Sequence, residues 1–576
     1  MLKKDSLLKG TVILAAAALV ARVLGVFQRV PLDYLMKDAG DAYFGVANTV
    51  YLTLLVIATG GIPSAISKMV SERYALGRPD EAQQIYKAAL LFGIVTGLIM
   101  TALLYIFAPY YAVHIVKTPG AETSIRAIAP ALLLFPVIAM MRGYFQGRQM
   151  MSAGGISQIV EQIMRVVVGV ALAFIVFAWG WGDRWTAAAA TFGSVFGSIG
   201  AFAVMLWFAR KLRRQDKTEA QSAAAGAVAA GAAAASGGTA AAAAAAAAQS
   251  AGAAAHPAGA KRLRLRNIYR EIFRMSIPVV VTGMTVQLIY LFDSSFLIRL
   301  TESFYDYRTA VDVLGQFNFK AQSIAGIPPI LAIALSQSII PVISAAYSVR
   351  NMSEVQRQSS LVMRIVVFTG VPAALALTVT SYSVTGFLFS GPDGSGVVAA
   401  LTAGTIFQIT MMTSNSILFG LGKPLPPMLN TFVGIGMKIL LSVAFAPMFG
   451  IYGLVAASTV CFIFITWLNL NHIRRETKLT VLGGRWPAYL IAVLLSAAAG
   501  YGVDVGIRAL LAGWPDKLAF LLALALAGIV NVLLYIGLLV LLRVVTAEDA
   551  KSFPGPLRKV FVRLTRKQRS GQGETG

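Results

Sequence analysis

The sequence is poor in charged residues, and in acidic residues above all. Only 13% of its 576 residues are charged, and 25 acidic residues stand against 49 basic ones, for a formal net charge of +24. Soluble domains carry about 25% charged residues, so this deficit, together with a hydrophobic content of 57%, excludes an ordinary soluble protein. A nucleic-acid-binding protein would spread its basic residues through a polar sequence, whereas here they crowd between apolar stretches. We therefore predict an all-α polytopic membrane protein.

Cysteine and histidine are almost absent. Cys461 is the single cysteine and lies within an apolar run, which excludes a disulfide framework and a thiolate metal cluster. The three histidines, His114, His256 and His472, are too scattered for a metal site. The chain also lacks the G-x-x-x-x-G-K-[ST] phosphate loop and any plausible Ser/His/Asp arrangement. We expect no enzyme activity, no metal and no cofactor.

Long apolar stretches fill most of the chain. A membrane-spanning helix needs about 20 mostly apolar residues, and fourteen stretches satisfy this. They are residues 8–36, 42–70, 86–115, 123–145, 153–180, 186–210, 272–300, 313–347, 360–389, 396–420, 426–448, 450–471, 487–510 and 517–543.

The connecting loops alternate in charge. Every second loop is basic, from Lys3 and Lys4 at the start to the cluster in the tail after residue 543, whereas the opposite loops are short and mixed. Basic loops face the cytoplasm. We predict a multi-pass protein of the plasma membrane with both termini in the cytoplasm.

An alanine-rich segment, residues 219–260, interrupts this pattern. Alanine is nearly neutral for membrane insertion, and a span here would invert the charge alternation of the second half. We interpret the segment as a cytoplasmic linker whose flanking basic clusters contact anionic lipid headgroups rather than nucleic acid. The predicted domains are a six-helix lobe (1–211), the linker (212–265), a second six-helix lobe (266–475), a final helix pair (476–545) and a basic cytoplasmic tail (546–576).

The two lobes share a short pattern. GIPSAIS at residues 61–67 and IPVIS at residues 340–344 each place a proline near the cytoplasmic end of a span, before a basic loop. Such repeats are typical of transporters whose lobes rock around a central site.

Charged residues within spans are expensive and mark functional sites. Arg22 and Arg29 in the first span are two helical turns apart and share a face, although Arg29 could instead snorkel to the outer interface. Lys320 and Lys438 have no partner nearby in the sequence. We predict that these four cations bind substrate, and their sign predicts an anionic one.

Two further positions have other predicted roles. Asp293 is either a structural partner of an arginine or part of a cation or proton site, and we treat it as the candidate for ion coupling. Glu161 and Arg165 are four residues apart on one helix, in the favourable order, and are predicted to form a structural ion pair.

Several motifs resemble one family when taken in order. LKGT at residues 8–11 leading to ARVLG at 21–25, GIPSAISK at 61–68, and RGYFQG at 142–147 are similar to the MurJ lipid II flippases and the stage V sporulation protein B group. Both belong to the multidrug/oligosaccharidyl-lipid/polysaccharide (MOP) exporter superfamily. The resemblance covers residues 6–545.

This resemblance implies fourteen helices in two six-helix lobes, a final pair that forms a lipid-facing groove, and transport by alternating access. The first-helix arginine of the family falls on Arg22. A second family arginine falls on Gln28, with Arg29 beside it, and the eighth-helix arginine has only Lys320 near its place. Lysine keeps the charge but loses the bidentate fork.

The main hypothesis is a flippase for lipid II or a related polyprenyl-pyrophosphate glycan, used in cell-wall or spore-cortex synthesis. Its partners would be that anionic lipid-linked glycan, membrane lipids, Na+ or H+ as coupling ion, and no nucleic acid. The alternatives are a flippase for another lipid-linked polysaccharide, a cation-coupled multidrug exporter, and a non-transporting scaffold for cell-wall synthesis enzymes.

Overall fold

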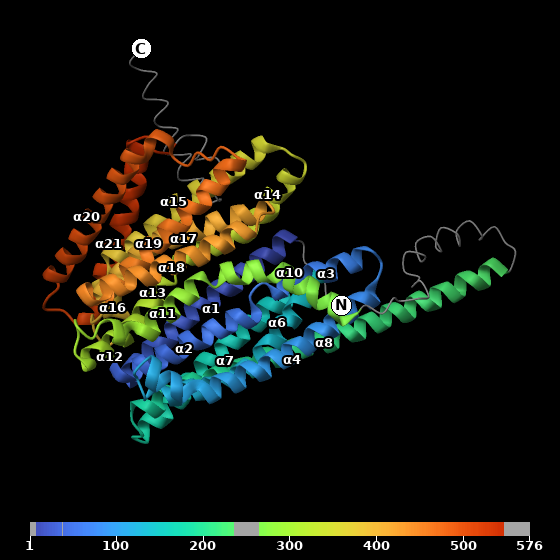
Figure 1. Cartoon of the computed structure of the whole chain (residues 1–576), viewed down its shortest axis with the longest axis horizontal. Helices are drawn as coiled ribbons and strands as arrows, with labels where there is room; N and C mark the ends of the chain where they lie inside the picture. The colour runs from blue at the N-terminus through green and yellow to red at the C-terminus, as the bar shows by residue number, and fades with distance from the viewer. Residues whose placement is uncertain (1–6, 37, 236–263, 546–576) are drawn as a thin grey trace, which may run out of the picture.

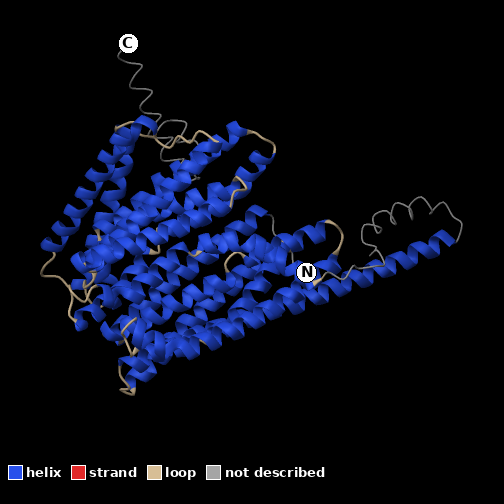
Figure 2. Ribbon diagram, in the orientation of Figure 1, coloured by secondary structure: helices blue, strands red, loops and turns tan. Residues whose placement is uncertain are grey.

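The computed structural model describes residues 7–36, 38–235 and 264–545, and every regular element in these ranges is a helix (Figures 1 and 2). The predicted all-α polytopic fold is confirmed. Much of the large apolar surface of the helices is exposed, as at Leu98, Phe174 and Leu440, because in a membrane the lipid replaces a protein partner.

The first half of the chain forms one lobe. A break at Gly60 and Gly61, where Gly61 has φ 72°, divides one predicted span into α2 and α3. The helices of this lobe are α1 (Leu7–Leu35), α2 (Asp38–Thr59), α3 (Ile62–Ala75), α4 (Pro79–Tyr110) with η1 (Tyr111–Ile115), α5 (Ala121–Ile128), α6 (Ala131–Gly147), α7 (Met151–Ala178) and α8 (Asp183–Ala235).

The second lobe starts after the linker, and two of its predicted spans are also broken. Helices α10 and α11 meet at a 51° bend, and a series of short helices replaces the eighth span. The helices of this lobe are α10 (Leu265–Gly283), α11 (Thr285–Leu300), α12 (Tyr307–Gly315), η2 (Gln316–Ala321), α13 (Gln322–Ala325), α14 (Pro329–Ser348), α15 (Met352–Val379), α16 (Ser381–Leu388), α17 (Ser395–Gly420), α18 (Leu425–Phe449) and α19 (Ile451–Glu476).

The final pair, α20 (Trp486–Leu510) and α21 (Asp516–Leu541), follows the short η3 (Gly483–Arg485) and packs against α15 and α16 at the edge of the second lobe (Figure 1). The Tyr489 hydroxyl donates to the carbonyl of Val367 at 3.1 Å, which fastens α20 to α15.

Eleven helical segments of the described chain are long and apolar enough to cross a membrane, or twelve when α10 and α11 count as one. Each of the fourteen predicted ranges overlaps a helix or a series of helices. The two ranges outside the twelve are 8–36, which is α1, and 313–347, which is the α12–α14 series. The number fourteen therefore stays a prediction.

Helix α8 continues past the predicted end of its span as far as Ala235, so the first part of the predicted linker is helical (Figure 1). The rest of the linker, residues 236–263, and the basic tail lie outside the described residues.

The two lobes meet at one end of the bundle and separate toward the other (Figure 1). At the closed end α2 packs against α11, α12 and η2 of the second lobe. At the other end, which includes the loops predicted to be cytoplasmic, α10 stays on α3 while α14 diverges from the first lobe. The molecule thus has a sealed end and a divided end.

Candidate functional site

A cavity of about 1230 Å³ lies between the lobes at their divided end. Residues of α1, α3, α6 and α7 form one wall, and residues of α10, α14 and α17 form the other. The rim includes Met150 and Pro424, which lie in connections predicted to be cytoplasmic. The cavity therefore opens toward the predicted cytoplasmic side.

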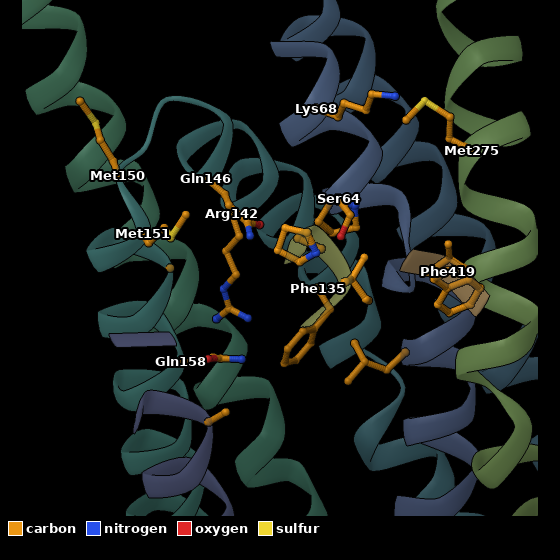
Figure 3. Close-up of a pocket in the computed structure, with 18 of the residues that line it drawn as sticks. Ser64, Lys68, Phe135, Arg142, Gln146, Met150, Met151, Gln158, Met275 and Phe419 are labelled. Carbon is orange, nitrogen blue, oxygen red and sulfur yellow. The ribbon is translucent and has the colours of Figure 1, made fainter. Parts of the chain in front are cut away.

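The two walls differ in chemistry. The wall from the first lobe carries most of the polar side chains, namely Ser64, Lys68, Arg142, Gln146, Gln158, Glu161 and Gln162. The opposite wall is largely apolar, with Met275, Val279, Ile340, Pro341 and Phe419, and has one charged residue, Arg274. Figure 3 shows Arg142 extending from α6 toward Gln158, with Ser64 and Lys68 on α3 nearby.

The cavity is electropositive. Its charged lining residues in the described chain are three cations, Lys68, Arg142 and Arg274, and one acid, Glu161. Lys68 lies 3.8 Å from Glu72 in an exposed pair, which has little energetic weight. A wall with this excess of positive charge attracts an anion.

Arg142 belongs to a cluster of charges on the first lobe. Its Nε donates to Ser157 Oγ at 2.8 Å, and its Nη2 donates to Glu161 Oε2 at 2.9 Å. The other oxygen of Glu161 accepts from Arg165 at 3.2 Å, and Arg165 also contacts the Tyr51 hydroxyl at 3.3 Å. The predicted partners Glu161 and Arg165 are thus paired, and Arg142 joins them.

Arg29 lies at the sealed end. Its Nη1 donates to the carbonyl of Asn318 at 2.9 Å and to that of Phe319, and its guanidinium lies over the rings of Phe44 and Phe319. Arg29 therefore joins α1 to η2 across the lobes rather than reaching the interface.

Lys320 closes the same end. It forms a buried ion pair with Asp33 at 3.3 Å, with both side chains at most 4% exposed. Asp33 also accepts from the main-chain N–H of Ser390 at 2.6 Å, so one carboxylate connects α1 with two parts of the second lobe. Opening this end must break these contacts.

Loops predicted to face outward add further bonds between the lobes. Lys117 pairs with Glu302, and the Tyr307 hydroxyl donates to the carbonyl of Lys117 at 2.9 Å. Nearby, the hydroxyls of Tyr111 and Ser295 share a hydrogen bond of 2.6 Å.

Arg22 follows Ala21, which lines the cavity, but is not itself among the lining residues, and its side chain reaches α13 of the second lobe. Its Nη2 donates weakly to the carbonyl of Gln322 at 3.3 Å, and its buried Nε has no partner among the described residues. The guanidinium occupies space beside Gly326, where any side chain would collide with it. An unsatisfied guanidinium at this place is a potential anion ligand.

Lys438 and Asp293 lie inside the second lobe and pair with each other. Their side chains are 0% and 1% exposed, Ser458 Oγ donates to Asp293 at 3.1 Å, and the Lys438 ammonium lies 4.0 Å from the centre of the Phe292 ring. Neither residue lines the cavity. The structure thus brings together two predicted site residues that sequence spacing could not connect.

Arg148, in the loop after α6, ties the rim to α8. It forms a bidentate pair with Asp216 at 2.6 and 2.8 Å and stacks over Tyr74. Burial opposes the charged form, but the hydrogen bonds to Asp216, the nearby Tyr74 and Tyr144 and the charge of Asp216 together outweigh it and raise the pKa of Arg148.

None of the four predicted substrate residues lines this cavity: Arg22 follows the lining residue Ala21, Arg29 and Lys320 seal the far end, and Lys438 is enclosed. Sequence reasoning did not single out Arg142 as a site residue. The available signal was its position before the end of an apolar stretch, inside the RGYFQG motif. Within the described chain, no three His, Cys, Asp or Glu residues are grouped so as to hold a metal.

Comparison with known proteins supports the resemblance seen in the sequence. Residues 7–223 match the family described as "Polysaccharide biosynthesis protein". The chain is 23% identical to the lipid II flippase MurJ of Bacillus subtilis, over 87% of this chain and 88% of that protein. It is 21% identical to the stage V sporulation protein B of the same organism, over 96% and 98%.

Solved structures show the same fold. An inward closed conformation of lipid II flippase MurJ matches with a TM-score of 0.60 and 14% identity, over 91% of this chain and 98% of that one. An inward-facing multidrug resistance MATE family transporter of the MOP superfamily matches with 0.59 and 13%, over 79% and 95%. The predicted resemblance is confirmed. The chain is a multi-pass membrane protein that is distantly similar in sequence to a lipid II flippase and similar in fold to a MATE family transporter.

Proposed function

We propose that the chain is a flippase that moves a polyprenyl-pyrophosphate-linked glycan from the inner to the outer leaflet by alternating access, with lipid II as its cargo. The observation that carries this proposal is the electropositive cavity between the lobes, which is sealed at the predicted outer end. A headgroup with negative charge would enter from the predicted cytoplasmic side.

The transport cycle would use the two ends of the bundle in turn. Binding of the headgroup neutralises part of the positive charge in the cavity, which favours closure of the divided end. The outer end would then open by separation of Asp33 from Lys320 and of Arg29 from the carbonyls of η2. In the open state Arg29 and Lys320 would be exposed and without these partners, at the moment when the anionic headgroup leaves.

Arg22 is the proposed ligand at the inner limit of the cavity. Its buried Nε lacks a partner, and a phosphate oxygen would satisfy it through a charge-assisted hydrogen bond. In this proposal Arg29 and Lys320 assist by keeping the predicted outer end closed until the cargo binds.

Asp293 remains the proposed residue for coupling to Na+ or H+. Because the ammonium of Lys438 already neutralises its carboxylate, an entering cation would have to replace that ammonium. The geometry thus favours a role for Lys438 as the partner of Asp293, rather than a role in contacting the cargo directly.

A cation-coupled multidrug exporter is the second candidate, and the similarity to MATE transporters favours it. Cationic drugs would require acidic groups in the cavity, where Glu161 is the one acid among the charged lining residues that the structure describes. We therefore rank this function lower.

The test is complementation of a bacterial strain depleted of its own lipid II flippase. We expect the wild-type chain to restore growth and to prevent lipid II from accumulating in the inner leaflet. Arg22→Glu should abolish rescue at equal expression, because it reverses the charge beside the cavity. Failure of the wild type, or rescue by Arg22→Glu, would count against the proposal, and altered drug sensitivity without lipid II accumulation would favour the exporter.

A further inference from the structure

We propose that Arg142, in the lining of the cavity, is a second ligand for the phosphate of the cargo in addition to Arg22, and that Ser157 and Glu161 are the positioning residues that aim its guanidinium. This inference rests on the proposed function and deepens it, because it names a further group that recognises the phosphate. The ligand class is a pyrophosphate or phosphodiester attached to a group rich in hydroxyls and amides.

The free edge of the Arg142 guanidinium carries the first step of the argument. Ser157 and Glu161 engage Nε and Nη2, which form one edge of the planar group. Nη1 has no hydrogen-bond partner among the described residues, and one hydrogen of Nη2 also points along the second edge. That edge offers the two parallel N–H donors that match two oxygens of a phosphate.

The local charge is the second step. A single carboxylate, that of Glu161, lies between the guanidiniums of Arg142 and Arg165, so the cluster has a net charge of about +1. The three side chains are only 11–21% exposed, so water screens this excess charge less than at an open surface. An anion can bind to Arg142 without first displacing Glu161.

The surroundings of Arg142 define the ligand more closely. Gln146 lies one helical turn from Arg142 on α6, and Gln158 and Gln162 lie on either side of Glu161 on α7; all three line the cavity. Figure 3 shows Gln146 and Gln158 on the same side of the cavity as Arg142. Amide side chains both donate and accept hydrogen bonds, so they suit the hydroxyls or amides of a sugar next to its phosphate.

The other cations of the cavity lack these features. Lys68 is a point charge, 61% exposed, and already paired with Glu72. Arg274 is exposed at the apolar wall, and no described residue holds its guanidinium. Arg142 is therefore the arginine of the described cavity lining whose orientation is fixed by the fold.

The test compares Arg142→Lys with Arg274→Lys, the same substitution at the other arginine of the cavity. Full-length protein in nanodiscs is titrated with undecaprenyl pyrophosphate, and with undecaprenol as the ligand without phosphate. We expect Arg142→Lys to weaken binding of the pyrophosphate by roughly tenfold, because lysine keeps the charge but loses the fork. Arg274→Lys should bind like the wild type, and undecaprenol should bind all three proteins equally.

Thermal unfolding of each variant separates a binding role from a structural one. Equal melting temperatures with a selective loss of pyrophosphate binding support the inference, whereas equal binding by Arg142→Lys and the wild type overturns it. If Arg142→Lys fails to fold, Ser157→Ala serves instead: it removes one positioning bond, should weaken pyrophosphate binding by a smaller factor, and overturns the inference if binding is unchanged. If the wild type itself prefers undecaprenol or binds neither lipid, the proposed function fails, not only the role of Arg142.

Discussion

Each lobe contains a cluster of charges at membrane depth, and the two clusters differ in exposure. In the first lobe Arg142 and Glu161 line the cavity, Arg165 pairs with Glu161, and the three side chains are 11–21% exposed. In the second lobe Asp293 and Lys438 are at most 1% exposed and are enclosed by α11, α18 and α19. The first cluster holds two cations and one anion, whereas the second holds one of each.

The difference follows from the cost of removing charge from water. An isolated ion in a sealed apolar site costs several kcal/mol, so it needs a partner of opposite sign. A cluster beside a cavity can hold excess charge because water, or a ligand, compensates for it. A charged cluster can bind cargo when it has a net charge and lies beside a cavity that water or ligand can enter. A neutral pair without such access holds helices together, whatever its depth in the membrane.

The largest expected effect on stability is at the enclosed pair of Asp293 and Lys438. Replacement of Lys438 by Met leaves the carboxylate of Asp293 buried and unpaired, which should destabilise the protein by about 3–5 kcal/mol. Thermal unfolding in detergent measures this loss. The double variant Asp293→Asn with Lys438→Met should recover most of the stability, since no unpaired charge remains; a single variant as stable as the wild type would show that the pair is not sealed.

The pair at the closed end, Asp33 and Lys320, extends the comparison to charges that join the lobes. Asp33→Asn leaves Lys320 unpaired only while the outer end is closed, so it should favour the open state by about 1–3 kcal/mol. Ser295 is buried in the contact with Tyr111 between the lobes, so a cysteine introduced as Ser295→Cys should be alkylated faster when this end opens. The native Cys461 is buried and provides the background rate of alkylation.

The matched control for this experiment is Asp33→Asn combined with Lys320→Gln, which removes the unpaired charge and should return alkylation toward its original rate. If Asp33→Asn lowers the melting temperature but leaves the alkylation rate unchanged, the pair stabilises one lobe and does not act as a gate.

The smallest effect is expected at the cluster beside the cavity. Glu161→Gln raises its net charge by one, and the loss of stability should be smaller than at Lys438 because the cluster borders a cavity that water can enter. Glutamine keeps an oxygen that can accept the hydrogen bond from Arg142, so the guanidinium stays aimed while the competing negative charge is removed. Binding of undecaprenyl pyrophosphate in nanodiscs should therefore tighten severalfold, and transport should slow because release is slower. Glu72→Gln, which also removes an acid near the cavity mouth, is the control and should change neither; weaker binding in Glu161→Gln would contradict the assigned net charge.

The sequence predicted the class of fold well because hydrophobic runs and loop charges are local signals. The apolar stretches overlap helices throughout, and the resemblance carried by RGYFQG and its companion motifs is confirmed. The breaks at Gly61, at the α10–α11 bend and along η2 were not predicted, because a hydropathy window averages over the few residues that interrupt a helix.

The site was harder to predict than the fold. Lys438 and Asp293 are separated by 145 residues, and Asp33 and Lys320 by 287, so no spacing rule could reveal that they pair. Arg142 looked like one more basic residue near a loop, although it is the arginine held against the cavity by α7.

The sequence by itself determined that this chain crosses a membrane repeatedly and that its intramembrane charges are mostly basic, because both properties are sums over residues. Only the tertiary structure decided which of those charges are neutralised, which hold the sealed end closed and which face a cavity. Those outcomes depend on distances of a few ångströms between residues hundreds of positions apart, and electrostatic energy in a medium of low polarity is set by such distances.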